Sequence, residues 1–362
     1  MNRTSQSAAA VVADHVLFHL RYLPGLVLCL VLAGAGIAIG TLPWMGAHGL
    51  SPLTVATVLG MALGNIVSSR WLDGAGTGIV LAKHGLLRLG IVLYGVKLTL
   101  QDIGRVGGTG LMIDGAMVLS TFTIAWIVGT RVLRMDRQTT LLIGAGSSIC
   151  GAAAVLATEP VVEASADKVT VAVATVVVFG TLAIFLYPLL YRSGLLQGIL
   201  PHGGMAFGIY EGSTIHEVAQ VLAAAQSLGP SATDSAVIAK LVRVMMLAPF
   251  LIGLSAWLSR KGSTSVSTRG IPARPLAMPW FAFLFAGVVI LNSVVHSTSA
   301  FRAHVNEFDM VLLGMAMAGV GLTTRIASIR HAGMRPLILG VTLWAWLVLG
   351  GAIVNGIVSR WL

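Results

Sequence analysis

A long stretch without charge limits what this chain can fold into: residues 22–69 contain no Lys, Arg, Asp or Glu. One transmembrane helix needs about 20 apolar residues, so this stretch is too long for a single span. Pro43 and Pro52 predict a tight turn between two spans. The whole chain is 56% hydrophobic and only 10% charged, whereas soluble proteins carry about 25% charged residues. The sequence therefore predicts an all-α polytopic membrane protein.

Apolar segments between turn residues predict the individual spans. We expect about eleven transmembrane helices, within a range of about ten to twelve, in a single transmembrane domain covering 1–362. A cytoplasmic N-terminal segment, 1–22, precedes the spans, and a cytoplasmic loop rich in Ser, Thr and Arg occupies 259–276. No soluble domain is expected. The expected spans are 23–43, 52–69, 85–100, 109–130, 139–162, 168–190, 203–226, 234–258, 277–297, 309–324 and 336–358.

Basic residues predict the orientation, because cytoplasmic loops carry an excess of Lys and Arg. With the N-terminus inside, fifteen basic residues face the cytoplasm: Arg3, Arg21, Arg70, Lys83, Arg131, Arg134, Arg137, Arg192, Arg260, Lys261, Arg269, Arg274, Arg325, Arg330 and Arg335. Four face the other side: Arg105, Lys168, Arg302 and Arg360. The net charge of +10 is thus spread over loops beside the lipid bilayer. Without a basic stripe carrying aromatic residues, nucleic acid is not expected as a partner.

A segment rich in small residues predicts a binding site at membrane depth. It reads Gly144-Ala-Gly-Ser-Ser-Ile-Cys-Gly-Ala-Ala-Ala-Val155. We expect a broken or crossing helix to start here, because small residues admit a ligand and irregular backbone within a bilayer must line a cavity or be buried in protein. The free N–H groups and the dipole of a helix start favour an anion. The candidate substrate-binding residues are Gly146, Ser147, Ser148, Ile149, Cys150 and Gly151.

A second polar cluster, Tyr210-Glu-Gly-Ser-Thr-Ile-His-Glu-Val-Ala-Gln220, predicts groups that line the same site. Its Ser and Thr are placed to cap a helix, and its His is able to exchange a proton near neutral pH. The alternative is that these polar groups bond to one another and fix helix packing. The candidate binding residues here are Ser213, Thr214 and His216, and the candidate coupling residues are His216, Glu217 and Glu159.

Lys240 and Arg243 form a third cluster and share one helix face, being three residues apart. If the helix starts near Asp234, Arg243 lies about 13 Å along it, close to the bilayer midplane. Lys240 has the alternative of extending its amine toward the membrane surface. Arg243 is too deep for this and needs a carboxylate, several carbonyls or an anionic substrate as partner. Glu159, Glu211 and Glu217 are the candidate carboxylates.

Enzyme chemistry is not expected. A zinc protease helix needs a second His four residues after His216, where Gln220 stands. Cys29 and Cys150 fall inside apolar segments and are expected to be packing residues. We therefore expect no catalytic residues, no metal and no cofactor.

Two pairs of similar sequence segments, called sequence echoes below, bear on whether the chain contains an internal repeat. Leu89-Gly-Ile-Val-Leu-Tyr-Gly-Val-Lys-Leu-Thr99 and Leu313-Gly-Met-Ala-Met-Ala-Gly-Val-Gly-Leu-Thr323 lie on spans expected to run in opposite directions, which is typical of an inverted repeat in a transporter. The alternative is chance, because Leu, Gly and Val are common in membranes. Gly146-Ser-Ser-Ile149 and Gly212-Ser-Thr-Ile215 are expected to run in the same direction, so we do not interpret them as a duplication.

Four motifs in order resemble the family named for sulfate export, the YeiH-like bacterial inner-membrane proteins. They are Ser147-Ser-Ile-Cys-Gly-Ala-Ala-Ala154 continuing to Thr158-Glu-Pro160, Gly180-Thr-Leu-Ala-Ile-Phe-Leu-Tyr-Pro188, His216-Glu-Val-Ala-Gln220 and Lys240-Leu-Val-Arg243. The resemblance implies a fold similar to bile-acid-symporter-like carriers, with inverted repeats of about five helices crossing at a central site. An eleventh span would then be an N-terminal addition.

The expected function is a secondary transporter in the bacterial inner membrane that exports a small oxoanion, sulfate or sulfite. The anion would bind at the two helix starts, with Arg243 and secondarily Lys240 neutralising its charge. Transport of a sulfonate or another small organic anion, and an anion channel, stay open as alternatives. The coupling ion and a homodimeric assembly stay open as well.

Overall fold

The computed structural model describes residues 3–47, 50–67, 74–260, 280–295, 298–325 and 333–361, with the side chains of 3–20 outside the description. The described residues form helices and turns and no strands. Seven helices are long and apolar enough to cross a membrane, and shorter apolar helices accompany them. The predicted all-α polytopic membrane protein is confirmed.

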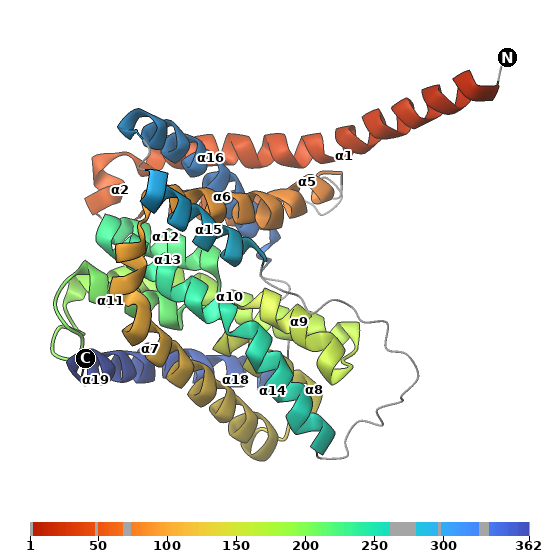
Figure 1. The fold of residues 1–362 in the computed structure, drawn as a ribbon. Coiled ribbons are helices and arrows are strands. Elements are labelled where there is room, and N and C mark those ends of the chain that lie inside the picture. Colours follow the sequence, from red (N-terminus) through yellow and green to blue (C-terminus); the bar gives the residue numbers. More distant parts are fainter. Residues whose placement is uncertain are drawn as a thin grey trace. The chain divides into compact units, whose positions relative to one another are not determined.

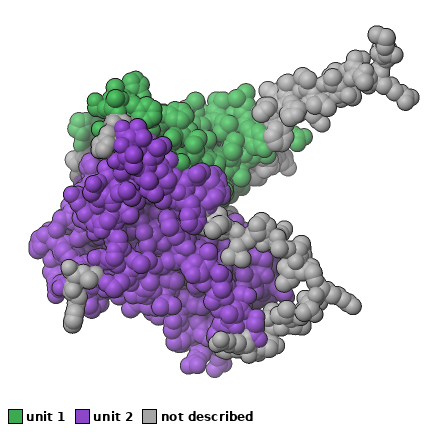
Figure 2. Space-filling model, in the orientation of Figure 1, with its two compact units in different colours: residues 1–94, 297–325 green, residues 95–296, 326–362 purple. Residues whose placement is uncertain are grey.

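The chain divides into two compact units (Figure 2). Unit 1 contains Met1–Tyr94 and Ser297–Arg325, and unit 2 contains Gly95–His296 and Ile326–Leu362. The described helices of unit 1 are α1 (Arg3–Gly40), α2 (Pro43–Ala47), α3 (Pro52–Ile66), α5 (Gly76–Val80), the π-helix η1 (Leu81–Leu86), α6 (Leu87–Tyr94) and α16 (Ser299–Thr323).

Unit 2 begins with the short η2 (Gly95–Lys97) and the long α7 (Leu100–Ile127), which ends in the π-turn η3 (Val128–Val132) (Figure 1). Its other described helices are α8 (Arg137–Ser148), α9 (Ala152–Val162), α10 (Ala166–Ser193), α11 (Gly204–Thr214), α12 (Val218–Ala225), η4 (Gln226–Leu228), α13 (Pro230–Met245), α14 (Leu247–Arg260), α15 (Trp280–Val295), α18 (Met334–Ala345), η5 (Trp346–Gly350) and α19 (Gly351–Trp361).

Every expected span overlaps a described helix or helix pair, with shifted boundaries. The helix of the first span already begins at Arg3, and that of the third begins at Gly76 rather than near 85. The expected loop 259–276 lies outside the described residues from position 261 onward. Two expected spans, 139–162 and 203–226, do not cross at all, because each is a helical hairpin.

The first hairpin consists of α8 and α9. Gln138, in the first turn of α8, donates from Nε2 to the carbonyl oxygens of Val162 and Glu163 at the end of α9, both at 3.0 Å. The two ends of the segment therefore lie together, and the chain reverses at 149–151. At 1.5 Å per residue, the 12 residues of α8 extend about 18 Å, well short of the ~30 Å hydrocarbon core.

The second hairpin consists of α11 and α12. Helices α11 and α13 run parallel, since Gly208 lies against the carbonyl of Ala232 and Gly212 lies one turn further on against the carbonyl of Ala236. Near the start of both helices, Ser235 donates to the carbonyl of Met205 at 3.1 Å. Because α12 leads through η4 and Gly229 directly into the start of α13, it returns to the side from which α11 entered.

The two hairpins enter unit 2 from opposite ends of α10. Lys168, in the first turn of α10, forms an ion pair of 2.9 Å with Asp136 just before α8. At the other end, Tyr187 donates to the hydroxyl of Thr214 at 2.8 Å, in the last turn of α11. The hydrophobic core follows the same division. The first half of α10 packs with the α8–α9 hairpin, through Val169, Ala172 and Val176 against Leu142, Val155 and Val162. The second half packs with the α11–α12 hairpin, through Ala183 and Tyr187 against Phe207, Ile215 and Val221.

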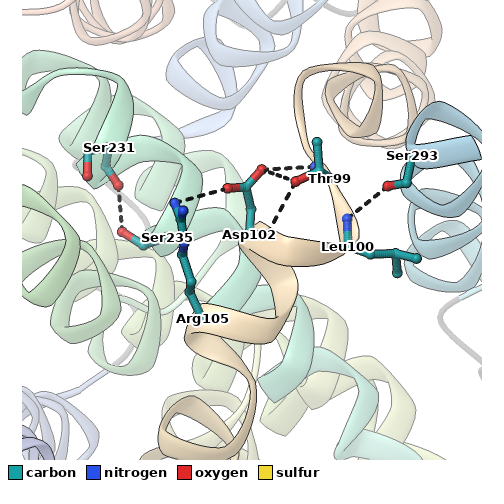
Figure 3. A network of polar contacts seen from close by, with 7 residues as sticks. All are labelled: Thr99, Leu100, Asp102, Arg105, Ser231, Ser235 and Ser293. Atoms are coloured by element: carbon teal, nitrogen blue, oxygen red, sulfur yellow. Dashed lines mark hydrogen bonds and ion pairs between the residues drawn. The ribbon is translucent and has the colours of Figure 1, made fainter. Parts of the chain in front are cut away.

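Helix α7 begins on the α11 side of unit 2 and ends on the α8 side. Its N-terminus is fixed by a capping box, in which Thr99 and Asp102 each accept from the other's backbone amide (Figure 3). The amide of Leu100 also donates to Ser293 of α15 at 2.8 Å. At the far end, Gly129 lies against Thr140 of α8, so α7 and α8 run antiparallel.

In unit 1, residues 89–94 from the first half of the longer sequence echo run antiparallel to the second half. Gly90 of α6 lies against Leu313 of α16, while Ile79, at the end of α5, and Lys83 approach Gly319 further along α16. The expected opposite directions of these two segments are therefore confirmed.

Candidate functional site: the tips of two opposed hairpins

Each hairpin tip presents the end of one helix and the start of the next, whereas the sequence had predicted only helix starts. Helix α8 ends at Ser148 and α11 ends at Thr214, and new helices begin only at Ala152 and Val218. The predicted break within 146–151 is confirmed and a helix does start at its end, with Gly151 as N-cap, but residues 146–148 belong to the last turn of α8 rather than to that start. This difference changes the chemistry of residues 146–148, because the last turn of a helix presents unpaired carbonyl oxygens rather than N–H groups.

Two cations from α13 fill these carbonyl ends. Lys240 donates from Nζ to the carbonyl oxygens of Ile149 and Ile215, at 2.7 and 2.6 Å. Arg243 also bonds to each tip, so each of the two cations joins both hairpins. Its guanidinium donates to the carbonyl oxygens of Ser148 at 2.7 Å and Ser147 at 2.9 Å on one side, and of Ser213 on the other.

Both cations are fully buried, at 0% exposure. An isolated buried charge is costly, whereas hydrogen bonds from a charged donor are strong and the negative end of a helix dipole favours a cation. The carbonyls of α8 and α11 thus meet the need for a partner that the depth of Arg243 had predicted. Carbonyls, rather than a glutamate, supply its hydrogen bonds among the described residues.

Glu217 occupies the positive ends of the other two half-helices. Its Oε1 accepts from the amide of Ala152, the first residue of α9, at 3.2 Å. It also forms the capping box of α12 with Gln220, whose Oε1 accepts from the Glu217 amide at 3.0 Å. The anion position that helix starts create is therefore filled by the protein's own carboxylate.

Gly151 allows this arrangement. Its φ is +68° and ψ is −132°, a conformation that residues with a side chain rarely adopt. A Cβ at this position would lie 2.5 Å from Cγ of Glu217. A larger residue would therefore both strain the turn and displace the carboxylate.

The remaining predicted residues have mixed outcomes. Ser213 and Thr214 do not cap a helix start, since both hydroxyls donate back to the carbonyl of Tyr210 within α11. His216 lies in the break, 1% exposed, and its Nδ1 has no hydrogen-bond partner among the described residues. Cys150 is a free, buried thiol at the other tip. Glu159 is not brought to the tips, because it lies half-buried in the last turns of α9, near the base of its hairpin.

The shorter sequence echo now has a structural explanation. Ile149 and Ile215 hold equivalent positions, since each follows the last turn of a half-helix and each bonds Lys240 through its carbonyl. The two copies enter from opposite sides, so their expected common direction is wrong. The error arises because hairpins were counted as crossing helices.

Sequence reasoning missed two polar residues beside the tips. Asn355 of α19 donates from Nδ2 to the hydroxyl of Ser213 at 3.1 Å. Asp114 of α7 is 0% exposed, and neither carboxylate oxygen has a hydrogen-bond partner among the described residues. A signal for Asp114 was present, because it is the one charged residue between positions 109 and 130.

No group of three or more His, Cys, Asp or Glu within the described residues is placed to hold a metal ion. The site is therefore built from buried cations, buried carboxyls and helix ends. The fold and the site define the class: an all-α polytopic membrane protein in which two opposed helical hairpins meet at buried charges.

Comparison with known proteins identifies the family. The chain belongs to the family described as conserved hypothetical protein 698, which matches residues 24–340. It is 53% identical over 331 residues to a UPF0324 membrane protein of Pseudomonas aeruginosa, covering 91% of this chain and 93% of that protein. It is 47% identical over 338 residues to the UPF0324 inner membrane protein YeiH of Escherichia coli K12, covering 93% and 95%.

No solved structure matches the chain. The expected YeiH-like membership is confirmed, and the location is the bacterial inner membrane, since relatives are named inner membrane proteins and the chain carries several membrane-spanning helices.

Proposed function

We propose that this protein is a secondary transporter that exports a small oxoanion, with sulfate and sulfite as the first candidates. One observation carries the proposal: two fully buried cations, Lys240 and Arg243, lie where the tips of two opposed hairpins meet. Charged groups at membrane depth are rare and mark substrate pathways. Broken helices meeting at a central site are a recurrent feature of secondary transporters.

The cations retain donors for an anion. An ammonium has three N–H groups and a guanidinium has five. Lys240 uses two on carbonyls and Arg243 uses three. One donor of the lysine and two of the arginine are left, whereas the Ser213 hydroxyl and the Asn355 amide spend their donors within the protein. A small tetrahedral oxoanion matches a site of few, closely spaced donors better than a large organic anion does.

The hairpins suggest how access would alternate. The α8–α9 hairpin enters from one side and the α11–α12 hairpin from the other, and both are fastened to α13 at their tips. Because each cation bonds to both tips, an anion that competes with the tip carbonyls for Lys240 and Arg243 would loosen the attachment of both hairpins to α13 and so favour a second arrangement of the tips, as transport requires.

The hairpins also refine the proposed topology. Because neither hairpin crosses, Lys168 moves to the cytoplasmic side and Arg192 to the periplasmic side, and the balance of basic residues remains fifteen to four. The number of crossing segments stays odd. We therefore keep the proposal of a cytoplasmic N-terminus and a periplasmic C-terminus.

Counterflow in proteoliposomes tests the function. Vesicles containing the purified protein are loaded with unlabelled sulfate and diluted into trace radiolabelled sulfate, with sulfite, a sulfonate and chloride as competitors. A carrier gives transient accumulation of label that saturates and is reduced by sulfite. A channel gives no accumulation above equilibrium, and competition by the sulfonate alone would assign the site to organic anions. No accumulation with any loaded anion would refute the transporter.

A further inference from the structure

Asp114 differs from Lys240, Arg243 and Glu217 because it lacks a hydrogen-bond partner among the described residues. Lys240, Arg243 and Glu217 are all bonded to backbone, whereas both carboxylate oxygens of Asp114 are buried and unbonded among the described residues. A buried carboxylate without hydrogen bonds is unfavourable unless it is protonated or faces a positive charge.

The depth of Asp114 matches that of the cations. Helices α7 and α13 are in contact and both begin on the α11 side. Asp114 lies fourteen residues after the start of α7 and Arg243 thirteen after the start of α13, so both are about 20 Å along their helices. Arg243 and Lys240 are the two cations that interact electrostatically with the Asp114 carboxyl.

Two other titratable groups, Glu217 and the Cys150 thiol, also interact with Lys240, but the Glu217 carboxylate already accepts from backbone amides. Glu211 of α11 is also fully buried with both carboxylate oxygens unbonded among the described residues, but burial rather than either cation dominates its surroundings. Tyr210 donates its hydroxyl to the carbonyl of Val348. His216 lies in the α11–α12 break and is itself held next to Lys240 and Arg243. Asp114 is thus the carboxyl whose charge is balanced by the proposed anion-binding pair.

We propose that Asp114 is the proton-carrying group of the transport cycle, an inference that rests on the proposed function. When Asp114 is ionised, it neutralises part of the charge of Lys240 and Arg243 and weakens their attraction for an anion. When a proton from water binds the carboxylate, that charge becomes available to the anion, so proton and anion bind together and leave together. A dianion that leaves with one proton still carries one net negative charge outward, a direction that an inside-negative potential favours.

The test compares three variants in the same sulfate-loaded proteoliposomes. Asp114→Asn mimics the protonated carboxyl at nearly constant size, Asp114→Glu keeps a titratable group, and Glu211→Gln removes the neighbouring buried carboxyl. In the wild type, sulfate affinity should fall with rising pH by up to tenfold per unit, the limit for one linked proton. Asp114→Asn should retain sulfate exchange but lose this dependence and the response to an imposed pH gradient. Asp114→Glu and Glu211→Gln should both retain the dependence.

Two results would overturn the proposal: an unchanged pH dependence in Asp114→Asn, or its loss in Glu211→Gln. A separate measurement keeps this test independent of sulfate. Infrared difference spectra of the wild-type protein, titrated without any anion, should show a protonated carboxyl band that is missing in Asp114→Asn. If sulfate never binds, the proposed function fails while the infrared titration still decides whether Asp114 takes up a proton. If Asp114→Asn does not fold, Asp114→Glu takes its place in both measurements. A carboxyl band and a pH dependence that are the same in Asp114→Glu as in the wild type would then exclude Asp114 as the proton-carrying group.

Discussion

Removing the Arg243 side chain should test the site most directly, because three hydrogen bonds to two hairpins depend on it. In Arg243→Ala, the carbonyls of Ser147, Ser148 and Ser213 lose their common donor. Hydrogen bonds to a charged group contribute about 1.5–3 kcal/mol each. Water entering the vacated volume would recover part of this, so we expect a loss of about 3–5 kcal/mol, as found when one partner of a buried charged pair is removed.

Such a loss is large beside a typical total stability of about 5–15 kcal/mol. The melting temperature of Arg243→Ala in detergent should fall by roughly 4–7 °C, because an unfolding entropy of about 2.1 cal/mol/K per residue over 362 residues makes about 1 kcal/mol shift the midpoint by about 1.3 °C. Arg243→Lys keeps the charge and part of the bonding, so its loss should be smaller. Arg105→Ala is the matched control, because that arginine side chain is 70% exposed and its ion pair with Asp102 is weak.

Anion binding separates the structural role of Arg243 from the functional one. Sulfate at one hundred times its dissociation constant should stabilise the wild type by about 2.7 kcal/mol. Arg243→Lys, which should still fold, should show a smaller upward shift with sulfate. An Arg243→Ala protein that melts like the wild type and still binds sulfate normally would show that the reasoning about both roles is wrong.

Three further predictions concern the tips, the base of the first hairpin and the topology. Gly151→Ala should destabilise the protein by about 1–3 kcal/mol, whereas Gly104→Ala, where a Cβ meets open space, should be neutral in the same melting assay. Although partial burial raises the pKa of Asp136, hydrogen bonds from Lys168 and the Thr139 amide lower it more, so the net pKa lies below its usual range. The Asp136 contribution is then present above the unfolded pKa of about 3.9, and the melting difference between the wild type and Asp136→Asn should disappear as pH falls through the lower folded value. Alkaline phosphatase fused after Leu362 should be active, and an inactive fusion with a fluorescent cytoplasmic reporter would contradict the odd number of crossings.

Hydropathy and turn residues were sufficient to predict the class of fold and the approximate position of each helical segment. They could not separate a crossing helix from a hairpin, because 139–162 and 203–226 have the apolar length of a span. What decides the matter is a reversal at Gly151 and another at Ile215, which is a property of φ, ψ and tertiary contacts rather than of composition.

The sequence predicted which segments meet at the candidate site, but it did not predict the helix ends at Ser148 and Thr214. Small residues at 146–151 and the deep pair Lys240 and Arg243 were correctly singled out as lying at one place. The sequence alone could not show that the small residues end one helix before they begin the next, so the amide of Ala152 was expected but the free carbonyls at 147–149 were not. Asp114 was overlooked because it stands alone in an apolar segment, without a neighbouring polar residue to form a motif.

The arrangement of charges at the tips follows from the geometry of two opposed hairpins. Each hairpin brings one negative helix end and one positive helix end to the centre of unit 2. Lys240 and Arg243, three residues apart on one face of α13, supply cations to both negative ends, while Glu217 supplies an anion to both positive ends. These three side chains therefore make the closed centre stable without any substrate. If the protein transports an anion as proposed, the anion would compete with backbone carbonyls for some of the N–H groups of the cations, so its binding would be coupled to loosening of the tips, and a protonated Asp114 would bias that competition toward the anion.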